Sequence, residues 1–406
     1  MNATAKLDEY IPVVGQAIID DLKLLAERLA QKHVLHVNST AVGGGVAEIL
    51  SRMVPLLGEM GINTKWEVIK GGDQFYQVTK KFHNVLHGRP DEVTPADFEI
   101  FMETSRKNIA EMNTDYDIVF IHDPQPIALI QKKGQNKWIW RCHIDVSKPH
   151  PIVWAFLKEF IVRYDASVFS APSFSQQLPI RQALISPSID PLSEKNRELS
   201  PEDVDRVLAK YQISRDKPII TQISRFDRLK DPVGVIEAFL MVRKYIDCQL
   251  ILAGGTATDD PEGLQVLAEV KEKAADNPDI HILLLPQNDF EVNALQRGSD
   301  VIMQKSLKEG FGLTVSEALW KVKPVVAGNV GGIPLQIKHK YSGMLCNSVE
   351  GAAFALKQIL NSPAFAKRLG ENGREHIRNN FLLTRHLRDY MLLFLSLDYA
   401  EDLVYL

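Results

Sequence analysis

The sequence predicts two α/β domains in tandem, each an open parallel sheet covered by helices. Short apolar runs alternate with longer segments of helical periodicity along most of the 406 residues. A polar stretch, residues 191–216, interrupts this alternation, which then starts again. Strands separated by helical segments of this length form parallel sheets through right-handed crossovers. The interruption marks the boundary between the domains.

The first domain is expected over residues 1–192. An amphipathic helix is predicted over 15–31, where Ile18, Leu22 and Leu25 recur at helical spacing. A second helix is predicted from Gly45 to about Met60. The strands predicted in this half are 34–37, 66–69, 118–121, 138–140, 168–169 and 183–185.

The second domain is expected over residues 193–380. Ser200 followed by Pro201 predicts a helix start, because serine caps the first turn and proline fits the first helical position. Another helix is predicted near 231–245. The strands predicted here are 219–223, 249–253, 282–285, 301–303 and 325–327. The remaining segment, 381–406, has a helical apolar pattern, and its packing on the second domain or back on the first is left open.

Composition narrows the class of function. A hydrophobic content of 45% excludes a disordered chain, and a net charge of -4 provides no basic field for nucleic acid or an anionic membrane. The three cysteines lie too far apart for a disulfide framework or a CxxC site. The N-terminus lacks the order of a signal peptide, and no apolar run approaches the ~18 residues that span a bilayer. We therefore expect a soluble, cytoplasmic protein that binds small molecules. A homodimer formed through the segment before Val34 is left open.

A glycine-rich turn follows the first predicted strand. Gly43, Gly44 and Gly45 open the next helix, where backbone N–H groups can approach an anion. The turn lacks the third glycine of GxGxxG, and the chain has no Gly-Lys-Ser/Thr of a P-loop. A flexible turn without a ligand is the alternative for this segment taken alone.

Two basic residues follow the first strand of the second domain. Arg225 and Lys230 lie at its carboxyl end, where they can converge on a diphosphate, arginine as a fork and lysine as a point charge. A solvated, charged loop is the alternative.

The strongest signal is a pair of glutamates around a glycine-rich bend. Glu309 precedes Gly310-Phe311-Gly312-Leu313-Thr314, and Glu317 lies about one and a half turns into the helix that follows. Exposed amides from Gly310 to Thr314 would favour an anion or sugar hydroxyls. The spacing lets Glu309 contact a sugar and Glu317 a ribose. A surface helix with two solvated glutamates is the alternative, although it gives the glycines no packing reason to flank Phe311.

Together these motifs resemble the retaining GT-B glycosyltransferases of family 4. Glu309 to Glu317 is similar to the E-x7-E motif of that family, and Ser224-Arg225 through Lys230 is similar to its GR-x4-K phosphate clamp. The glycine turn is similar to its N-terminal donor loop. The resemblance covers nearly the whole chain and implies two Rossmann-like domains facing across a cleft.

Three further segments resemble the glycosyltransferring trehalose synthases. They are Ile121 to Gln125, Trp140 to Asp145 and Gly331 to Ile337. This resemblance implies reversible transfer of glucose from ADP- or UDP-glucose to free glucose, which gives α,α-trehalose. Many family 4 members have a glutamate after Gly-Gly-x-Pro, where this chain has Leu335, so the supporting role of that glutamate is not assigned here.

The resemblance also implies roles for individual residues. Arg225, Lys230 and the amides of Gly44 and Gly45 would hold the leaving diphosphate, which itself deprotonates the acceptor, so no protein nucleophile is required. Glu309 and the amides of Gly310, Phe311 and Gly312 would hold the donor glucose, with Leu313 and Thr314 beside it. Glu317 would bind the ribose, and the backbone at Gln287 the base.

The acceptor is expected to enter from the first domain, after its strands. The residues expected to contact it are His122, Asp123, Trp140, Arg141, His143 and Asp145. His143 is placed with Arg225, Lys230 and Glu309 in the catalytic set, because it could contact both sugars. No cofactor besides the nucleotide sugar is required and no metal site is implied, while a role for Mg²⁺ is left open.

Four other functions are weighed against this one. Within the same fold they are a trehalose phosphorylase-like enzyme, a sucrose-forming enzyme and a nucleotide-sugar epimerase. From a different class, a two-domain sugar-binding protein could close on its ligand without chemistry. Such a binding protein has no need of an Arg/Lys diphosphate clamp opposite a glycine loop.

Overall fold

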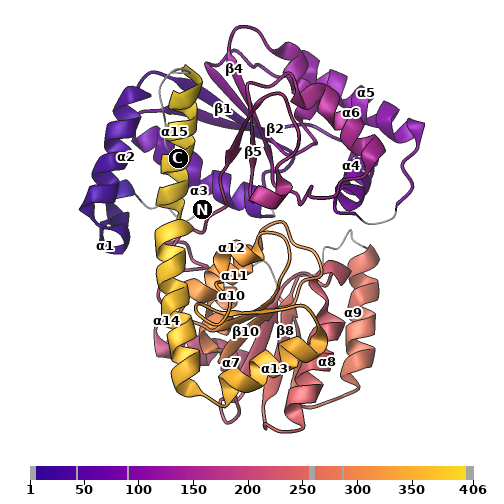
Figure 1. Ribbon diagram of the computed structural model, residues 1–406, viewed down its shortest axis with the longest axis vertical. Helices are drawn as coiled ribbons and strands as arrows, with labels where there is room; N and C mark the ends of the chain where they lie inside the picture. Colours follow the sequence, from indigo (N-terminus) through magenta and orange to yellow (C-terminus); the bar gives the residue numbers. More distant parts are fainter. Residues whose placement is uncertain (1–5, 43, 89–90, 256–260, 286–287, 399–406) are drawn as a thin grey trace. The chain divides into compact units, whose positions relative to one another are not determined.

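The computed structural model describes residues 6–42, 44–88, 91–255, 261–285 and 288–398. They divide into two compact units (Figure 1). Unit 1 contains the described residues of Met1–Ser188 and of Leu383–Leu406, and unit 2 is Ile189–Leu382. The chain therefore passes between the units at 188/189 and at 382/383, where the sequence predicted boundaries at 192/193 and 380/381.

Unit 1 is built on a six-stranded sheet in which all neighbouring strands are parallel. Its strand order is β2-β1-β3-β4-β5-β6. The strands are β1 (His33–Asn38), β2 (Asn63–Val68), β3 (Ile118–His122), β4 (Lys137–Cys142), β5 (Ala166–Phe169) and β6 (Arg181–Leu184). The order reverses between β1 and β3, and open α/β sheets bind ligands beyond the carboxyl ends of the strands at such a reversal.

Helices cover both faces of this sheet (Figure 1). The first group is α2 (Gln16–Arg28), α3 (Gly45–Glu59) and α15 (Leu383–Asp398), and the second is α4 (Asp73–Leu86), α5 (Pro95–Glu111) and α6 (Pro151–Ile161). The short helices are η1 (Leu7–Tyr10), α1 (Ile11–Val14), η2 (Ile127–Lys132) and η3 (Pro172–Phe174). Every residue of β3 is buried, as expected for a central strand covered on both sides.

The last helix, α15, packs on α2 and α3 (Figure 1). Arg141 at the end of β4 is fully buried and anchors it: its guanidinium donates to the Tyr390 hydroxyl at 2.6 Å and lies 3.0 Å from His386 Nε2. Because arginine can only donate, His386 accepts at Nε2, and its Nδ1–H donates to Ser188 Oγ at 2.9 Å. Of the two placements that the sequence left open, the helix packs within unit 1.

Removing the Tyr390 hydroxyl tests this anchor. Tyr390→Phe deletes one hydrogen bond to a charged, buried group, so we expect the free energy of unfolding of unit 1 to fall by about 1.5–3 kcal/mol. Urea denaturation followed by fluorescence measures the change. The same substitution at the exposed Tyr341 serves as the control and should leave stability unchanged. Equal stability of the two variants would mean that the anchor contributes nothing.

Unit 2 also contains a fully parallel six-stranded sheet, of order β12-β11-β10-β7-β8-β9. Its strands are β7 (Ile219–Ile223), β8 (Gln249–Gly254), β9 (Ile280–Leu284), β10 (Val301–Gln304), β11 (Val325–Gly328) and β12 (Met344–Cys346). Here the order reverses between β7 and β10. The site-forming crevice of this unit is therefore expected beyond these two strands.

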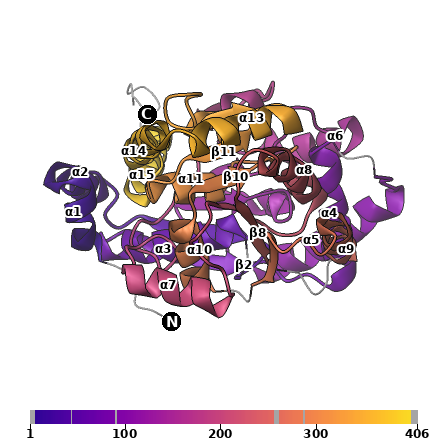
Figure 2. The ribbon, with the colours of Figure 1, turned by 90° about the horizontal axis from the view of Figure 1, so that it is seen from below.

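Each face of the second sheet has its own apolar core. On one face lie α8 (Pro232–Arg243), α9 (Pro261–Ala274) and α13 (Val349–Leu360), and α8 and α13 are neighbours in both views (Figure 2). On the other lie α7 (Pro201–Lys210) and α10 (Asp289–Gly298). The predicted start of α7 is confirmed, because Ser200 Oγ accepts from the Asp203 amide at 3.1 Å. The other helices are η4 (Arg228–Lys230), α11 (Leu313–Trp320), α12 (Ile333–Gln336) and α14 (Pro363–Asn380).

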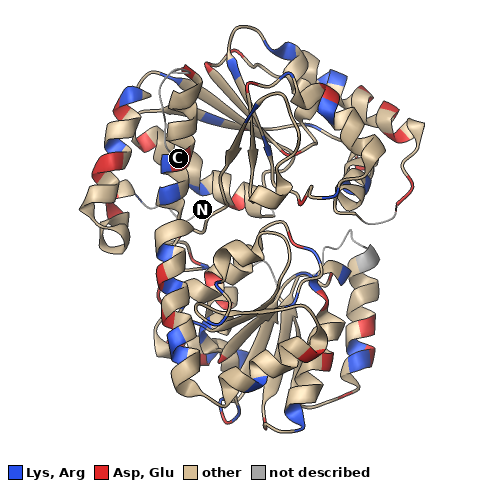
Figure 3. Ribbon diagram, viewed as in Figure 1, with Lys and Arg blue, Asp and Glu red and all other residues tan. Residues whose placement is uncertain are grey.

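Charged side chains of both signs occur along the helices, as α14 illustrates (Figure 3). Within the described part of the chain, every helix is too short or too polar to traverse a bilayer.

Candidate active site

In unit 2, the loops after β7 and β10 meet beyond the carboxyl ends of these strands. Lys230, after β7, places Nζ 2.5 Å from Glu309 Oε2, after β10. Ser306 Oγ donates to the same carboxylate oxygen at 3.2 Å, and the Leu307 amide donates to the Leu229 carbonyl at 2.8 Å. Two predicted site residues that are far apart in sequence thus form one ion pair at the topological switch point.

A tight turn holds Lys230 in place. Asp227 accepts from the Leu229 amide at 2.7 Å, and Gln222 Nε2 donates to the Lys230 carbonyl at 2.8 Å. The next residue, Asp231, has a left-handed φ of 51° and caps α8 through the Gly234 amide. Asp231 also pairs with Lys305 at the end of β10. These contacts fix the backbone from which the Lys230 side chain extends.

Arg225 is far more exposed than Lys230. Two-thirds of its side chain, 66%, is accessible, and its guanidinium lies 3.7 Å from the Asp227 carboxylate. Such weak, exposed pairing stabilises little, so the guanidinium can turn toward an anionic ligand at low cost.

The loop after β11 braces the Glu309 loop. Gly331 has a φ of 56°, and a Cβ there would lie 1.6 Å from the Glu309 carbonyl oxygen. The Gly332 amide donates to the Gly310 carbonyl at 3.1 Å, and Gln336 Nε2 donates to the Phe311 carbonyl at 2.5 Å. The sequence singled out Gly331 and Gly332 within a motif but did not predict this backbone contact. Glycine is required here because the two loops touch through their main chains.

The backbone at the start of α11 requires a glycine after Phe311. The Phe311 side chain is buried, with its ring centroid 5.5 Å from that of Phe381. Gly312 has a φ of 84° and is the N-cap of α11, which starts at Leu313 and continues through Thr314. The N-cap has no side chain to satisfy the first-turn amides, so the turn is suited to an anion or to hydroxyl groups.

Glu317 is the fifth residue of α11 and is buried. Its carboxylate is 3.8 Å from Lys195 Nζ, and Lys195 lies 3.6 Å from Asp289 as well. The sequence did not predict a role for Lys195, which comes from the polar stretch that precedes α7. The sequence of a polar linker does not indicate which residue of another element a lysine within it will contact.

A second lysine ties this linker to α11. Lys321 is buried and donates to Gln296 Oε1 at 2.7 Å, to Asn196 Oδ1 at 3.0 Å and to the Glu317 carbonyl at 3.2 Å. Burial lowers the pKa of Lys321 to about 7.

The predicted base platform at Gln287 lies outside the described residues, as does Gly43.

In unit 1, the glycine turn follows β1 as predicted, and α3 begins at Gly45. Gly44 has a φ of 80°, so glycine is needed for its backbone conformation, whereas the space around its missing Cβ is open. Asn38 at the end of β1 donates to the Thr40 carbonyl at 2.7 Å and accepts from Trp66 Nε1 at 2.8 Å. These bonds define the start of the turn.

Asp123 and His143 lie together beyond β3 and β4. The His143 amide donates to Asp123 Oδ1 at 2.7 Å, and the Asp123 amide donates to the Arg141 carbonyl at 2.7 Å. Asp123 has a φ of 66°, a strained conformation that marks functional positions in many proteins. Burial raises the pKa of Asp123 to about 7, although the His143 amide and the Arg141 charge oppose the shift.

Three predicted acceptor contacts, those of Trp140, Arg141 and His122, need correction, whereas the contact of Asp145 stays a prediction. Trp140 is fully buried against Trp154 and Phe169 and donates from Nε1 to the Asp123 carbonyl at 3.0 Å. Arg141 is fully buried and anchors α15. His122 is buried too, and buried Asp145 accepts from the Ser147 amide at 2.9 Å. With so little exposed surface, Trp140, Arg141 and His122 present no face to a sugar. Trp140 and His122 instead support Asp123 and His143 through hydrogen bonds.

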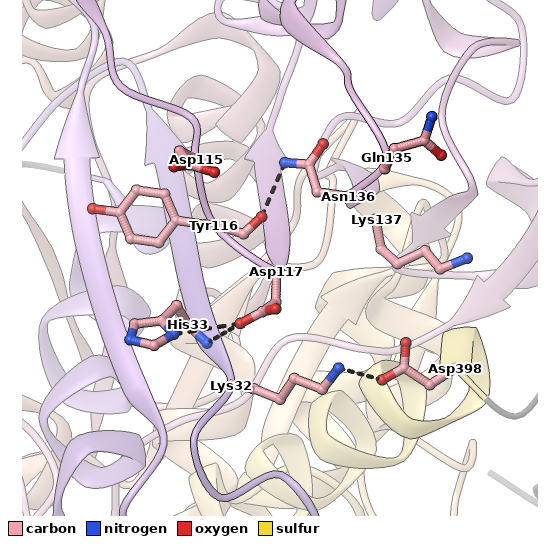
Figure 4. A pocket seen from close by; sticks show the side chains of 9 residues that line it. All are labelled: Lys32, His33, Asp115, Tyr116, Asp117, Gln135, Asn136, Lys137 and Asp398. Carbon is pink, nitrogen blue, oxygen red and sulfur yellow. Dashed lines mark hydrogen bonds and ion pairs between the residues drawn. The ribbon is translucent and has the colours of Figure 1, made fainter.

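Unit 1 also has a cavity of about 480 Å³ at the amino ends of β1 and β4 (Figure 4). It is lined by Lys32, His33, Asp115, Tyr116, Asp117, Gln135, Asn136, Lys137 and Asp398. Several of its charges are already paired: Lys32 Nζ lies 2.8 Å from Asp398, and His33 Nδ1 lies 3.4 Å from Asp117. The cavity lies at the opposite edge of the sheet from Asp123, so it is separate from the candidate site.

Two sequence families match this chain. The family described as "Trehalose synthase, N-terminal domain" matches residues 36–176, and "Glycosyl transferases group 1" matches residues 203–376. Trehalose synthase of Rubrobacter xylanophilus is 42% identical over 96% of this chain and 97% of its own length. The trehalose synthase of Thermococcus litoralis is 42% identical over 95% and 96%. Trehalose phosphorylase of Pleurotus pulmonarius is 28% identical over 91% of this chain but 58% of that enzyme.

Solved structures share the fold. Sucrose-phosphate synthase from Thermosynechococcus elongatus superposes with a TM-score of 0.71 at 19% identity, covering 91% of this chain and 100% of that one. A UDP-forming α,α-trehalose-phosphate synthase from Burkholderia xenovorans gives 0.72 at 15% identity, covering 92% and 100%. The two parallel-sheet units and these likenesses define the GT-B fold. The glycosyltransferase family match and the trehalose synthase relatives indicate a hexosyltransferase. At 42% identity over nearly its full length, the chain belongs to the trehalose synthase family.

Proposed function

We propose that the protein transfers glucose, with retention of the α configuration, from a nucleoside-diphosphate glucose to free glucose and forms α,α-trehalose. The observation that carries the proposal is the Lys230–Glu309 pair at the switch point of unit 2, in a chain of the trehalose synthase family. A cation and a sugar-binding carboxylate at one point suit a ligand that joins a diphosphate to a sugar. ADP- and UDP-glucose are the proposed donors.

On the donor side, Lys230 and Arg225 of unit 2 bind the diphosphate. Glu309 accepts hydrogen bonds from glucose hydroxyls, and Glu317 binds the ribose. In the free protein Lys230 is neutralised by Glu309. Donor binding therefore exchanges one ion pair for a diphosphate contact on Lys230 and hydroxyl contacts on Glu309.

In the proposed reaction, the bond between the anomeric carbon and the diphosphate oxygen breaks, and the electron pair leaves with the diphosphate. The acceptor hydroxyl attacks from the same face, and its proton passes to a phosphate oxygen of the leaving group. Negative charge grows on the diphosphate during this step, so the fixed cation of Lys230 and the guanidinium of Arg225, once turned toward the ligand, stabilise the transition state. No protein nucleophile and no cofactor besides the donor are needed.

On the acceptor side, the proposed contacts are the carboxylate of Asp123 and the ring of His143. Because the pKa of Asp123 is raised to about 7, the carboxylate that accepts a hydrogen bond from the acceptor is the major form only above that pH. We therefore expect kcat/KM for glucose to rise with pH through about 7 and then level off. Asp123→Asn should lower kcat/KM for glucose and remove its rise with pH. A wild-type profile that is flat between about pH 6 and 8 would contradict the assignment.

The proposal is tested by incubating the protein with ADP-, UDP- and GDP-glucose and with glucose, fructose or phosphate as partners. Product linkage is then determined by NMR. We expect a non-reducing glucose disaccharide only when a nucleotide donor and glucose are both present. A sucrose product, or epimerisation of the donor without an acceptor, would overturn the proposal. Binding of the donor with no turnover would favour a sugar-binding protein.

A phosphorylase is the second candidate, because trehalose phosphorylases are more distant relatives of this chain. Such an enzyme would cleave trehalose with inorganic phosphate and need no nucleotide. Phosphate-dependent release of glucose 1-phosphate from trehalose, with no response to nucleoside diphosphate, would favour it.

A further inference from the structure

Three histidines form a hydrogen-bonded column across the carboxyl edge of the first sheet. His36 Nδ1 on β1 lies 3.0 Å from His122 Nε2 on β3, and His122 Nδ1 lies 3.1 Å from His143 Nε2, just beyond β4. The rings are nearly parallel, with interplanar angles of 29° and 24°. His36 and His122 are buried, and only His143 reaches the candidate acceptor site.

Burial favours the neutral form of all three rings: it lowers the pKa of His36 to about 3 and those of His122 and His143 well below the usual value. A neutral imidazole has one N–H donor and one acceptor nitrogen. His122 therefore donates along one bond and accepts along the other. Consequently the three rings share one tautomer, with every proton on Nδ1 or every proton on Nε2.

The inner end of the column decides between these two arrangements. His36 Nε2 is buried and has no hydrogen-bond partner among the described residues, and the rings of Phe120, Tyr390 and Phe394 lie around it. With protons on Nε2, this atom would be an N–H donor without an acceptor, which is rarer in proteins than an unused acceptor. Protons on Nδ1 avoid this, because the N–H groups of His36 and His122 then each donate to the next ring outward and that of His143 points out of the column.

We propose that His36 and His122 are positioning residues that hold His143 as the Nδ1–H tautomer, so that His143 donates a hydrogen bond to a sugar hydroxyl. The sugar as partner rests on the proposed function, whereas the tautomer does not. His143 then cannot act as the base that deprotonates the acceptor, since its Nε2 lone pair accepts from His122 and its Nδ1 is already protonated. Donation toward a hydroxyl oxygen fixes the orientation of that sugar.

The tautomer is read directly from the resting, full-length protein labelled with ¹⁵N-histidine, without substrate. Long-range proton–nitrogen correlations distinguish a protonated Nδ1 from a protonated Nε2, and loss of one signal set in His143→Gln assigns this residue. We expect His143 protonated on Nδ1 only. A proton on Nε2, a mixture of tautomers or a charged ring would each overturn the proposal. None of these outcomes depends on whether trehalose is the product.

A matched pair of variants tests the consequence for turnover. His122→Asn keeps an amide N–H that can donate to His143 Nε2, whereas His122→Leu has a similar volume and no donor. We expect the leucine variant to lose at least tenfold in kcat relative to the asparagine variant and to show a mixed His143 tautomer. Affinity for the nucleoside diphosphate, which binds unit 2, should be equal in both.

The pair His36→Asn and His36→Leu, one ring further in, repeats the comparison if the changes at His122 prevent folding. Equal kcat for asparagine and leucine, with folding intact at either position, would mean that the column is only structural and would overturn the positioning role.

Discussion

Replacing Lys230 with alanine is expected to lower kcat by about 10²–10³-fold while the fold stays intact. The ammonium group is fixed by a tight turn at the switch point of unit 2, where the proposed diphosphate leaves. Loss of one preorganised group that stabilises developing negative charge typically has an effect of this size. Alanine also leaves the Glu309 carboxylate, which is only 10% exposed, without its cation, and this adds to the loss of kcat. Steady-state kinetics with the best nucleotide donor measures the change.

Lys244→Ala is the matched control, since this exposed lysine lies at the far end of α8, the helix that begins beside Lys230. It should retain wild-type turnover. Glu309→Ala should lose at least tenfold, and the double variant should lose less than the product of the two single effects, because the residues form one pair. Wild-type rates in a folded Lys230→Ala protein would show that the diphosphate does not bind at Lys230.

Adding a single methyl group at Gly331 is expected to have an effect of similar size. The Cβ of Gly331→Ala would lie 1.6 Å from the Glu309 carbonyl oxygen, and the φ of 56° is unfavourable for alanine. The Glu309 loop must therefore shift by an ångström or more, and a displacement of about 1 Å can lower turnover about 10²-fold. Kinetics and circular dichroism together separate a moved loop from an unfolded unit.

Gly351→Ala in the same unit is the control, because a Cβ there makes only ordinary contacts, the nearest at 3.5 Å from Ser348 Oγ. Its kinetics should match the wild type. If Gly331→Ala were as active as this control, the contact between the two loops would have no part in placing Glu309.

The sheets could be predicted almost strand by strand, because burial in a parallel sheet leaves a clear apolar run, whereas helices such as α4, α5 and α14 were not predicted. The prediction for β7, 219–223, coincides with the strand, and α3 begins at the predicted Gly45. The strand β12 was not predicted, since three residues give no readable pattern. The predicted helix over 15–31 begins at Gln16 because Gly15, with a φ of 88°, separates it from α1.

The candidate site could be predicted where a motif lies in one loop. Lys230 and Glu309 follow strands in the pattern of a known family, and the structure brings them together. The sequence does not reveal which side of a strand end faces the core, so Trp140 and Arg141 were wrongly placed at the acceptor. For the same reason His36 was assigned no functional role, although it forms the inner end of the histidine column.

The most direct test of the account follows a labelled glucose through the reaction. Unlabelled nucleotide-glucose and glucose labelled with ¹³C at the anomeric carbon are incubated with the protein, and the disaccharide is analysed by NMR. We expect α,α-trehalose that carries label in one of its two rings, with an α-linked anomeric carbon from each substrate. A β-linked anomeric carbon, no disaccharide, or label in both rings of the first product, analysed before reverse transfer can exchange the label, would contradict this expectation.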